Sequence, residues 1–167
     1  MNSEIELAEY DGVSVAIVPI IRQVNKLGKV SKRLKTAQSV HAAVIPGILG
    51  YRRYQLCQET GDKWLLDDGC GDVIGREKLR DRFNRKIRDS GVVRHPVRNL
   101  RNSWQTFTKW TLEIEPSKIE RMMGHVGKTI TERYYDRPEA EMLAKTIAAA
   151  YKMHPYAESW TDEVVST

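Results

Sequence analysis

The spacing of apolar residues changes along the chain, from a pattern typical of strands to one typical of helices. Residues 13–18 are rich in β-branched side chains, and the Asp11-Gly12 pair before them is a hairpin turn signal that joins them to residues 4–7. A second run of this kind covers residues 40–45. We therefore expect a small antiparallel sheet at the N-terminal end, in which Pro19 marks an edge position or the end of a strand.

From residue 46 onward the apolar residues recur at helical spacing. Helices are expected over residues 46–60, 77–89, about 99–114, 116–123 and 138–151. Pro116 and Gly124 bracket the fourth helix, because proline suits a first helical turn and glycine suits the position beyond a helix end. His125 is therefore the first side chain after a helix stop. The expected fold is mainly α with a small N-terminal antiparallel sheet, and 167 residues suit a single domain.

The same spacing predicts which side chains enter the core. On the helix that begins near residue 99 they are Trp104, Phe107, Thr111 and Ile114. On the two later helices they are Ile119, Met122, Met123, Met142, Leu143 and Ile147. The helix over residues 77–89 differs, because its apolar stripe is narrow and is surrounded by five basic residues. That stripe consists of Leu79, Phe83 and Ile87.

Charge is distributed unevenly along the chain. A net charge of +5 and a pI near 9.2 favour a polyanionic partner. Residues 12–58 carry eight Lys or Arg and no acid, residues 76–109 carry eleven basic and three acidic residues, and residues 132–167 carry seven acidic and four basic residues. We therefore expect the first two-thirds of the chain to face the anion. The basic stretch 22–35 is either a solvated loop or a basic arm that touches DNA.

Cysteine content and hydropathy indicate the cellular compartment of the protein. Cys57 and Cys70 have no partner pattern and no nearby histidine cluster, so we expect packed thiols in a reducing compartment, without a disulfide or a metal site. The longest apolar run, residues 13–21, is far shorter than the roughly 20 residues that span a bilayer. The N-terminus before it is acidic, unlike a signal peptide. We expect a cytoplasmic protein with no membrane contact.

The candidate chemistry lies between residues 98 and 135. Arg101 falls at the opening turn of a predicted helix, where phosphate is favoured, and its planar fork can donate two hydrogen bonds to a phosphate. His125 can donate to a phosphate oxygen or transfer a proton near neutral pH. Tyr134 is a nucleophile only if its proton is removed and the charge on the phosphate is held. These are the groups needed to hold a phosphodiester and attack it.

The order of these residues resembles that of a known family. The run Leu100-Arg101-Asn102-Ser103-Trp104, then Met123-Gly124-His125, then Tyr134 nine residues after the histidine, resembles the C-terminal catalytic motifs of the tyrosine recombinases, the phage integrase family. In that family the two motifs supply a catalytic arginine and a histidine, and the tyrosine becomes covalently bound to the 3′ phosphate of DNA. Residues 34–46 also look like the hairpin that carries the family's catalytic lysine, here Lys35. Residues 80–91 look like the arginine-rich helix before the second motif.

The resemblance implies a site-specific recombinase or integrase that cleaves and rejoins DNA strands through a 3′-phosphotyrosine, as in the movement of phages and other mobile elements. It implies the fold of a DNA breaking-rejoining enzyme and no metal or cofactor. The implied catalytic residues are Lys35, Arg98, Arg101, His125 and Tyr134, and the implied DNA-binding residues are Lys29, Lys32, Arg33, Arg80, Arg82 and Arg85. The implied partners are double-stranded DNA and further copies of the chain, in a synaptic tetramer joined through the C-terminal helix.

Two departures from the family pattern keep alternatives open. Arg98 stands where the family usually has histidine; the alternative register His95-Pro96-Val97-Arg98 restores the histidine but breaks the rest of the motif. The family's first catalytic arginine belongs to a Gly-x-Arg-x-x-Glu motif before the sheet, and this sequence has no such motif. We therefore expect residues 1–167 to form a partial catalytic domain that cleaves poorly alone.

Two rival functions and a second nucleophile follow from the same residues. One rival is a DNA-binding or regulatory module that keeps the fold without the activity, and the other is an enzyme like the type IB topoisomerases. Tyr135 is adjacent to Tyr134, and spacing from His125 favours Tyr134 as the nucleophile.

Overall fold

The N-terminal hairpin turns at Asp11 and Gly12 in the computed structural model. The structure describes residues 4–24, 29–31, 34, 40–60, 64, 67–125 and 139–154. Strands β1 (Glu6–Tyr10) and β2 (Val13–Ile20) pair in antiparallel fashion, and the two turn residues both have positive φ, +52° and +80°. Two successive positive φ angles are typical of the tight turn whose twist matches that of a hairpin. The hairpin predicted from the Asp-Gly signal is therefore confirmed.

Strand β5 (His41–Pro46) completes a sheet with the order β1-β2-β5. It pairs antiparallel with β2, so β2 is the central strand. The edge position considered for Pro19 is therefore wrong. Pro19 instead lies next to the last residue of β2, opposite Ala42, which agrees with the other interpretation, a strand end. Between β2 and β5 the chain forms a separate two-stranded ribbon, β3 (Gln23–Val24) with β4 (Val30–Ser31).

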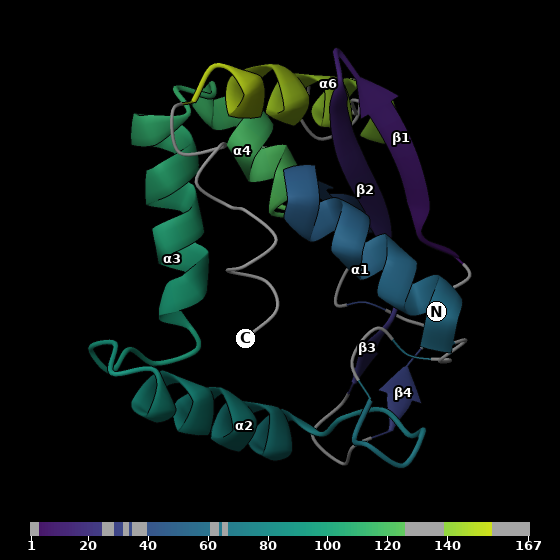
Figure 1. The fold of residues 1–167 in the computed structure, drawn as a ribbon, viewed down its shortest axis with the longest axis vertical. Helices are drawn as coiled ribbons and strands as arrows, with labels where there is room; N and C mark the ends of the chain where they lie inside the picture. The colour runs from purple at the N-terminus through teal and green to yellow at the C-terminus, as the bar shows by residue number, and fades with distance from the viewer. Residues whose placement is uncertain are drawn as a thin grey trace.

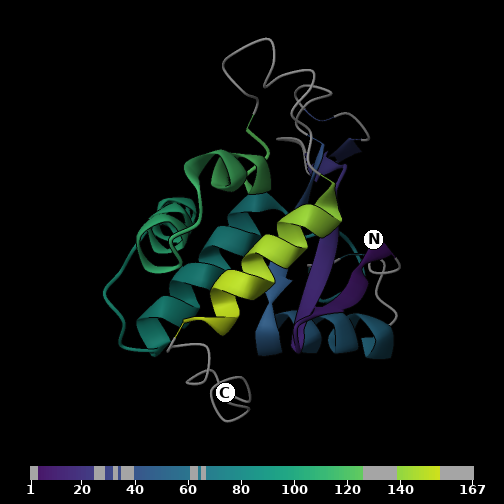
Figure 2. The same cartoon turned by 90° about the horizontal axis from the view of Figure 1, so that it is seen from above.

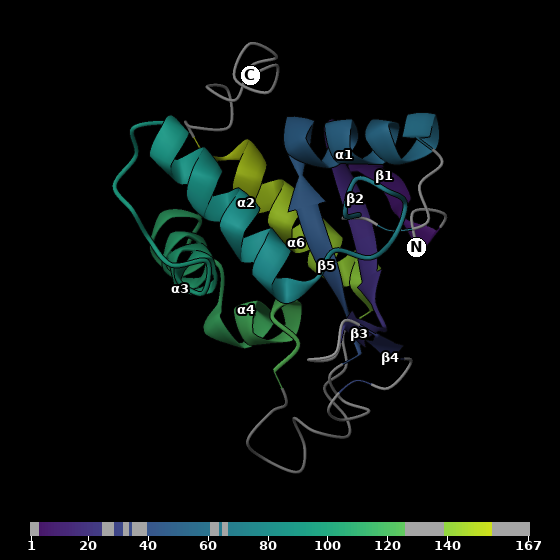
Figure 3. The same cartoon turned by 90° about the horizontal axis from the view of Figure 1, so that it is seen from below.

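Both faces of the sheet are covered. Successive side chains on a strand point to opposite faces, and the fully buried neighbours Val15 and Ala16 enter different core clusters. The face of Val15 packs against α6 (Ala140–Lys152), and the face of Ala16 packs against Cys57 of α1 (Gly47–Thr60). Figure 3 shows α1 and α6 on the two sides of the sheet. The sheet is thus the middle layer of a three-layer unit, with α1 on one face and α6, from near the C-terminal end of the chain, on the other.

Helix α1 approaches the sheet closely because of one glycine. A Cβ built on Gly50 would overlap the carbonyl of Ile45 on β5. Any larger side chain would therefore push the helix away from the strand that precedes it. The helix predicted over residues 46–60 is confirmed, and this packing fixes where β5 and its first residue, His41, lie.

The later helices lie beside this unit. They are α2 (Arg76–Asp89), α3 (Asn99–Thr106), the π-helical turn η3 (Phe107–Thr111) and α4 (Pro116–Met122). One of them, α2, forms an arm, and two others, α3 and α4, meet in a corner. Figure 1 shows α2 at the bottom of the molecule, far from α6 at the top, with α3 rising between them. No residue of α2 is buried, so its apolar stripe does not enter either core cluster. Figure 2 shows α4 close to one end of α6. The helices α4 and α6 share a core cluster.

The π-helical turn changes which residues of the third helix are buried. The Leu112 amide donates to the carbonyl of Phe107, five residues earlier, at 3.0 Å. One extra residue in the turn rotates the following side chains away from their α-helical positions. The predicted burial of Thr111 is therefore wrong: Thr111 is exposed, while Thr108 and Leu112 are buried. Ile114 is buried as predicted, although it lies beyond the helix.

Trp104 and Phe107, predicted to be buried, are only partly buried and pack against the core cluster. The remaining core predictions hold with two exceptions. Ile119, Met122 and Met123 are buried on α4 and just after it. Leu143 and Ile147 are buried on α6, but Met142 is 59% exposed, because it falls on the other side of that helix. Cys57 is a packed thiol as expected, whereas Cys70 is exposed in the loop before α2. In the described part of the chain, no helix combines the length and the apolar character needed to cross a membrane.

Candidate functional site

Arg101 and the end of α4 meet at the corner between α3 and α4. The Arg101 guanidinium donates from Nη2 to the carbonyl of Met123 at 2.6 Å. Met123 and Gly124 form the turn that ends α4, and His125 follows directly. Two of the predicted catalytic residues, 24 positions apart in sequence, are thus brought to one place through a single main-chain group. The Arg101 residue is otherwise exposed, on the first turn of α3.

His125 is held by Glu120 from two directions. Its amide donates to the Glu120 carbonyl at 2.9 Å, and its ring nitrogen Nδ1 contacts the Glu120 carboxylate oxygen Oε2. The other carboxylate oxygen, Oε1, accepts a hydrogen bond of 3.2 Å from Nε2 of Gln105 on α3. A connected set, Gln105 to Glu120 to His125, therefore joins α3 to the end of α4.

Sequence reasoning did not find Gln105 or Glu120. One signal was present for Gln105, which lies four residues after Arg101 and so shares its face of α3. Glu120 lies five residues before His125, a spacing that α-helical geometry does not bring together. The two residues meet because Gly124 leaves the helix with a φ of +70°, which folds His125 back over the last turn.

Gly124 also allows the sheet to touch the site. A Cβ on residue 124 would overlap the ring of His41, the first residue of β5. The ring of His41 therefore packs directly on the turn that carries His125. His41 was not predicted, since nothing in the local sequence indicates that β5 begins against the end of α4. Its position places the first residue of β5 beside the candidate site.

Arg98 lies one turn before Arg101. It stands at the N-terminal end of α3, is exposed, and makes no capping hydrogen bond with its side chain. Residues three apart on a helix share a face, so Arg98 and Arg101 present two guanidinium groups on the same side of α3. His95, the residue of the alternative register, is exposed in the segment before the helix. Lys35 and Tyr134 lie outside the described residues, as do Tyr135, Lys32 and Arg33.

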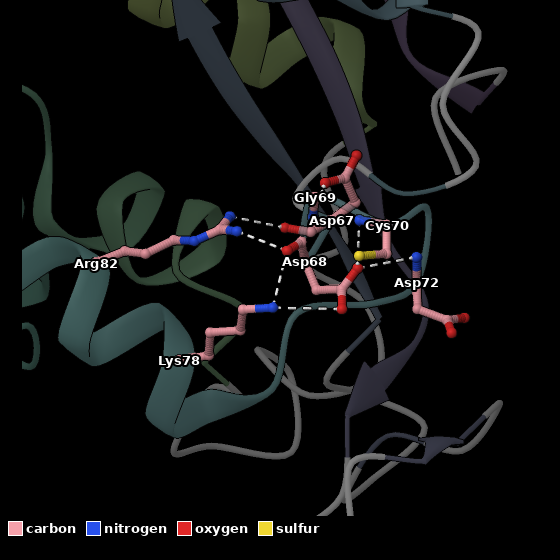
Figure 4. A network of polar contacts seen from close by, with 7 residues as sticks. All are labelled: Asp67, Asp68, Gly69, Cys70, Asp72, Lys78 and Arg82. Carbon is pink, nitrogen blue, oxygen red and sulfur yellow. Dashed lines mark hydrogen bonds and ion pairs between the residues drawn. The ribbon is translucent and has the colours of Figure 1, made fainter.

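Two basic residues of α2 are bound to the loop that precedes it. Arg82 donates to the carbonyls of Asp67 and Asp68 at 3.1 and 2.6 Å, and Lys78 donates to the Asp68 carbonyl at 2.9 Å (Figure 4). The Asp68 carboxylate accepts the amides of Cys70 and Asp72, and these hydrogen bonds, that of Cys70 first, lower the pKa of Asp68 below its usual value. Arg82 thus fastens the loop to α2.

A basic groove lies at the far end of α2. It has a volume of about 630 Å³. It is lined by Asp81, Asn84, Arg85, Arg88, Gly91, Val92 and Arg94. Three guanidinium groups and one carboxylate line it, so its charge suits an anion. Of the other predicted DNA-binding residues, Arg80 contacts the Asp81 carboxylate at 3.2 Å, and Lys29 is exposed immediately before β4.

The arrangement is suited to binding an anion and moving a proton. Two arginines at the start of α3 supply fixed positive charge, and an imidazole, a group that can accept or donate a proton, follows the turn that Arg101 contacts. Among the residues that the structure describes, no group of three or more His, Cys, Asp or Glu side chains could hold a metal ion. A scan against models of protein families finds no matching family, and searches of curated proteins and of solved structures return no match.

Proposed function

We propose that this protein cleaves and rejoins DNA strands through a covalent phosphotyrosine, as its resemblance to the tyrosine recombinases implies. The observation that carries the proposal is the joining of Arg101 to the turn before His125 by a single hydrogen bond of 2.6 Å. The resemblance requires these two residues to act on one phosphate. That requirement predicts that they lie near each other in three dimensions, although Arg101 is on α3 and His125 follows α4.

The role proposed for each residue follows from the chemistry of its side chain. Arg101, with Arg98 beside it, holds the nonbridging oxygens of the scissile phosphate and stabilises the charge that develops on them. His125 contacts the same phosphate or exchanges the nucleophile's proton. Tyr134 attacks phosphorus, and Lys35 donates a proton to the departing 5′ oxygen. The ester formed with the tyrosine retains the energy of the broken bond, so rejoining needs no nucleotide or metal.

The basic surface is proposed to position the duplex rather than to react with it. Contacts to phosphates fix register and orientation and supply much of the affinity. The groove of Arg85, Arg88 and Arg94 lies at the C-terminal end of α2 and in the segment after it, which connects to the arginines at the start of α3. Assembly of four copies on DNA through the C-terminal helix is part of the same proposal.

The proposal is tested by trapping the covalent intermediate. A pool of nicked duplexes with random sequence is incubated with the protein; cleavage beside a nick releases a short fragment, so rejoining fails and the adduct accumulates. We expect a protein-DNA adduct that survives denaturant with wild type and with Tyr135→Phe, and none with Tyr134→Phe. A long incubation is needed, because the motif of the family's first catalytic arginine is not found in this sequence. The loss of one such phosphate donor costs about 10²- to 10³-fold in rate.

Two other results would change the conclusion. An adduct with Tyr134→Phe but none with Tyr135→Phe would move the nucleophile by one residue. No adduct with wild type, together with salt-dependent duplex binding, would favour a DNA-binding module that lacks the cleavage activity.

A further inference from the structure

The least expected feature of the candidate site is that both oxygens of the Glu120 carboxylate face a hydrogen-bonding partner. Oε1 accepts from Gln105 on α3, and Oε2 faces the imidazole Nδ1 of His125. A carboxylate can only accept hydrogen bonds when it is ionised, so the nitrogen that faces it must carry the proton. The carboxylate therefore favours one of the two neutral forms of His125.

We propose that Glu120 is a positioning residue that fixes His125 in the Nδ1–H tautomer and thereby makes Nε2 a proton acceptor. The role of Nε2 as the acceptor of the nucleophile's proton rests on the proposed function. The assignment of the tautomer does not. Among the described residues Nε2 of His125 has no hydrogen-bonding partner, and the side chain is 41% exposed. The lone pair of Nε2 is thus available to a group that approaches from outside.

Gln105 fixes the orientation of the Glu120 carboxylate. Its side-chain amide donates to Oε1, which keeps the Glu120 carboxylate from turning and holds Oε2 towards the histidine. The amide of His125 is tied to the carbonyl of the same glutamate, which fixes the backbone on which the ring is mounted. Ring and carboxylate are therefore oriented by independent contacts, as in sites where a carboxylate sets the tautomer of a catalytic imidazole.

The consequence concerns the direction of proton transfer in strand cleavage. When a hydroxyl attacks the phosphate, its oxygen bonds to phosphorus while the bond from phosphorus to the 5′ oxygen breaks, and the leaving 5′ oxygen takes the proton proposed to come from Lys35. The O–H bond of the attacking hydroxyl breaks and an N–H bond forms at Nε2, which converts the imidazole to an imidazolium. Glu120 stabilises that cation by its charge, and the proton is returned from Nε2 when the strand is rejoined. A neutral His125 with its proton on Nε2 would instead donate to the phosphate and could not accept this proton.

The tautomer can be measured without DNA and without catalytic activity. Protein labelled with ¹⁵N is observed about two pH units above the ordinary imidazole pKa of about 6.5, where the ring is neutral, and two-bond ¹⁵N–¹H correlations identify the protonated nitrogen. The four histidines are distinguished by the signals that disappear in His125→Asn. We expect wild-type His125 in the Nδ1–H form and Glu120→Ala with the proton largely moved to Nε2.

Glu113→Ala is the matched control, because it removes an exposed carboxylate in the segment before α4. It should leave the His125 pattern unchanged, and a thermal melt of each variant shows that it is folded. An Nε2–H tautomer in wild type, or an Nδ1–H tautomer that persists in Glu120→Ala, would overturn the proposal. Since none of these readings involves cleavage, the proposal can fail while the proposed function stands, and the reverse also holds.

Discussion

Gly124 is the residue at which helix α4, strand β5 and the candidate site meet. Its φ is +70°, and the His41 ring occupies the space that a Cβ would need. Gly91 has nearly the same φ, +69°, but open space around it. The two glycines therefore differ in packing and share their backbone conformation, which makes them a matched pair.

We predict that Gly124→Ala lowers the free energy of unfolding more than Gly91→Ala does. Both substitutions force an L residue into the left-handed region, at a cost of about 1–2 kcal/mol. Only Gly124→Ala adds a steric clash, worth roughly a further 1–3 kcal/mol. Denaturant titration measures both, and in a His41→Ala background the two costs should become similar. Equal costs in the wild-type background would show that His41 does not pack on the turn.

Glu4 forms an ion pair with Arg22 just after β2. Arg22 donates to its two carboxylate oxygens at 2.7 and 2.9 Å, and these hydrogen bonds are the largest cause that lowers the pKa of Glu4, from 4.5 to about 2. A pKa that is lower in the folded state contributes stability above the unfolded value. That contribution is lost as the pH falls from 4.5 towards 2.

We therefore predict a pH-dependent effect of Glu4→Gln. The variant should melt below wild type near about pH 6, and the difference should shrink as the pH is lowered through about 4 to 3. Glu9→Gln, at an exposed position of β1, should show no such trend. A difference in melting temperature that stays constant over this range would mean that the ion pair is not formed.

At the scale of elements, α2 divides its basic residues between two tasks. Arg82 is bound to the carbonyls of the preceding loop, whereas Arg85 lines the basic groove. We predict that Arg85→Ala reduces the slope of log affinity for duplex DNA against log salt by about 0.9, with little change in melting temperature. Arg82→Ala should leave that slope unchanged and speed amide exchange in residues 67–72. The opposite assignment of effects would contradict this division.

Most elements were predictable because their signals are local. The hairpin follows from Asp11-Gly12, and the ends of α4 follow from Pro116 and Gly124. The π-helical turn was not predictable, because a single inserted residue leaves no mark in apolar spacing. It changed the buried residue from Thr111 to Leu112.

The candidate site was predictable in part for a related reason. The resemblance pointed to Arg101 and His125, which the corner between α3 and α4 brings together. Glu120 and His41 reach the site through the geometry after Gly124 and through the packing of β5. Such contacts depend on how distant segments pack, and one sequence does not reveal them.

At the scale of the whole molecule, a three-layer unit holds the corner that carries the candidate site. The sheet lies between α1 and α6, and α4 shares the core of α6 (Figure 1). The arm α2 lies apart from this core and carries the groove. This division into a packed part that carries the candidate site and a separate basic arm is consistent with the proposed function.

The central claim is that Arg101 and His125 act together on the scissile phosphate. It is tested most directly by the rate at which Arg101→Ala forms the covalent adduct on nicked duplexes, compared with wild type and with Lys118→Ala. Lys118 is an exposed cation on α4, so its removal controls for charge. We predict a rate about 10²- to 10³-fold lower for Arg101→Ala with duplex affinity reduced only a few-fold, and an unchanged rate for Lys118→Ala. Adduct formation by Arg101→Ala at the rate of the lysine control would contradict the account.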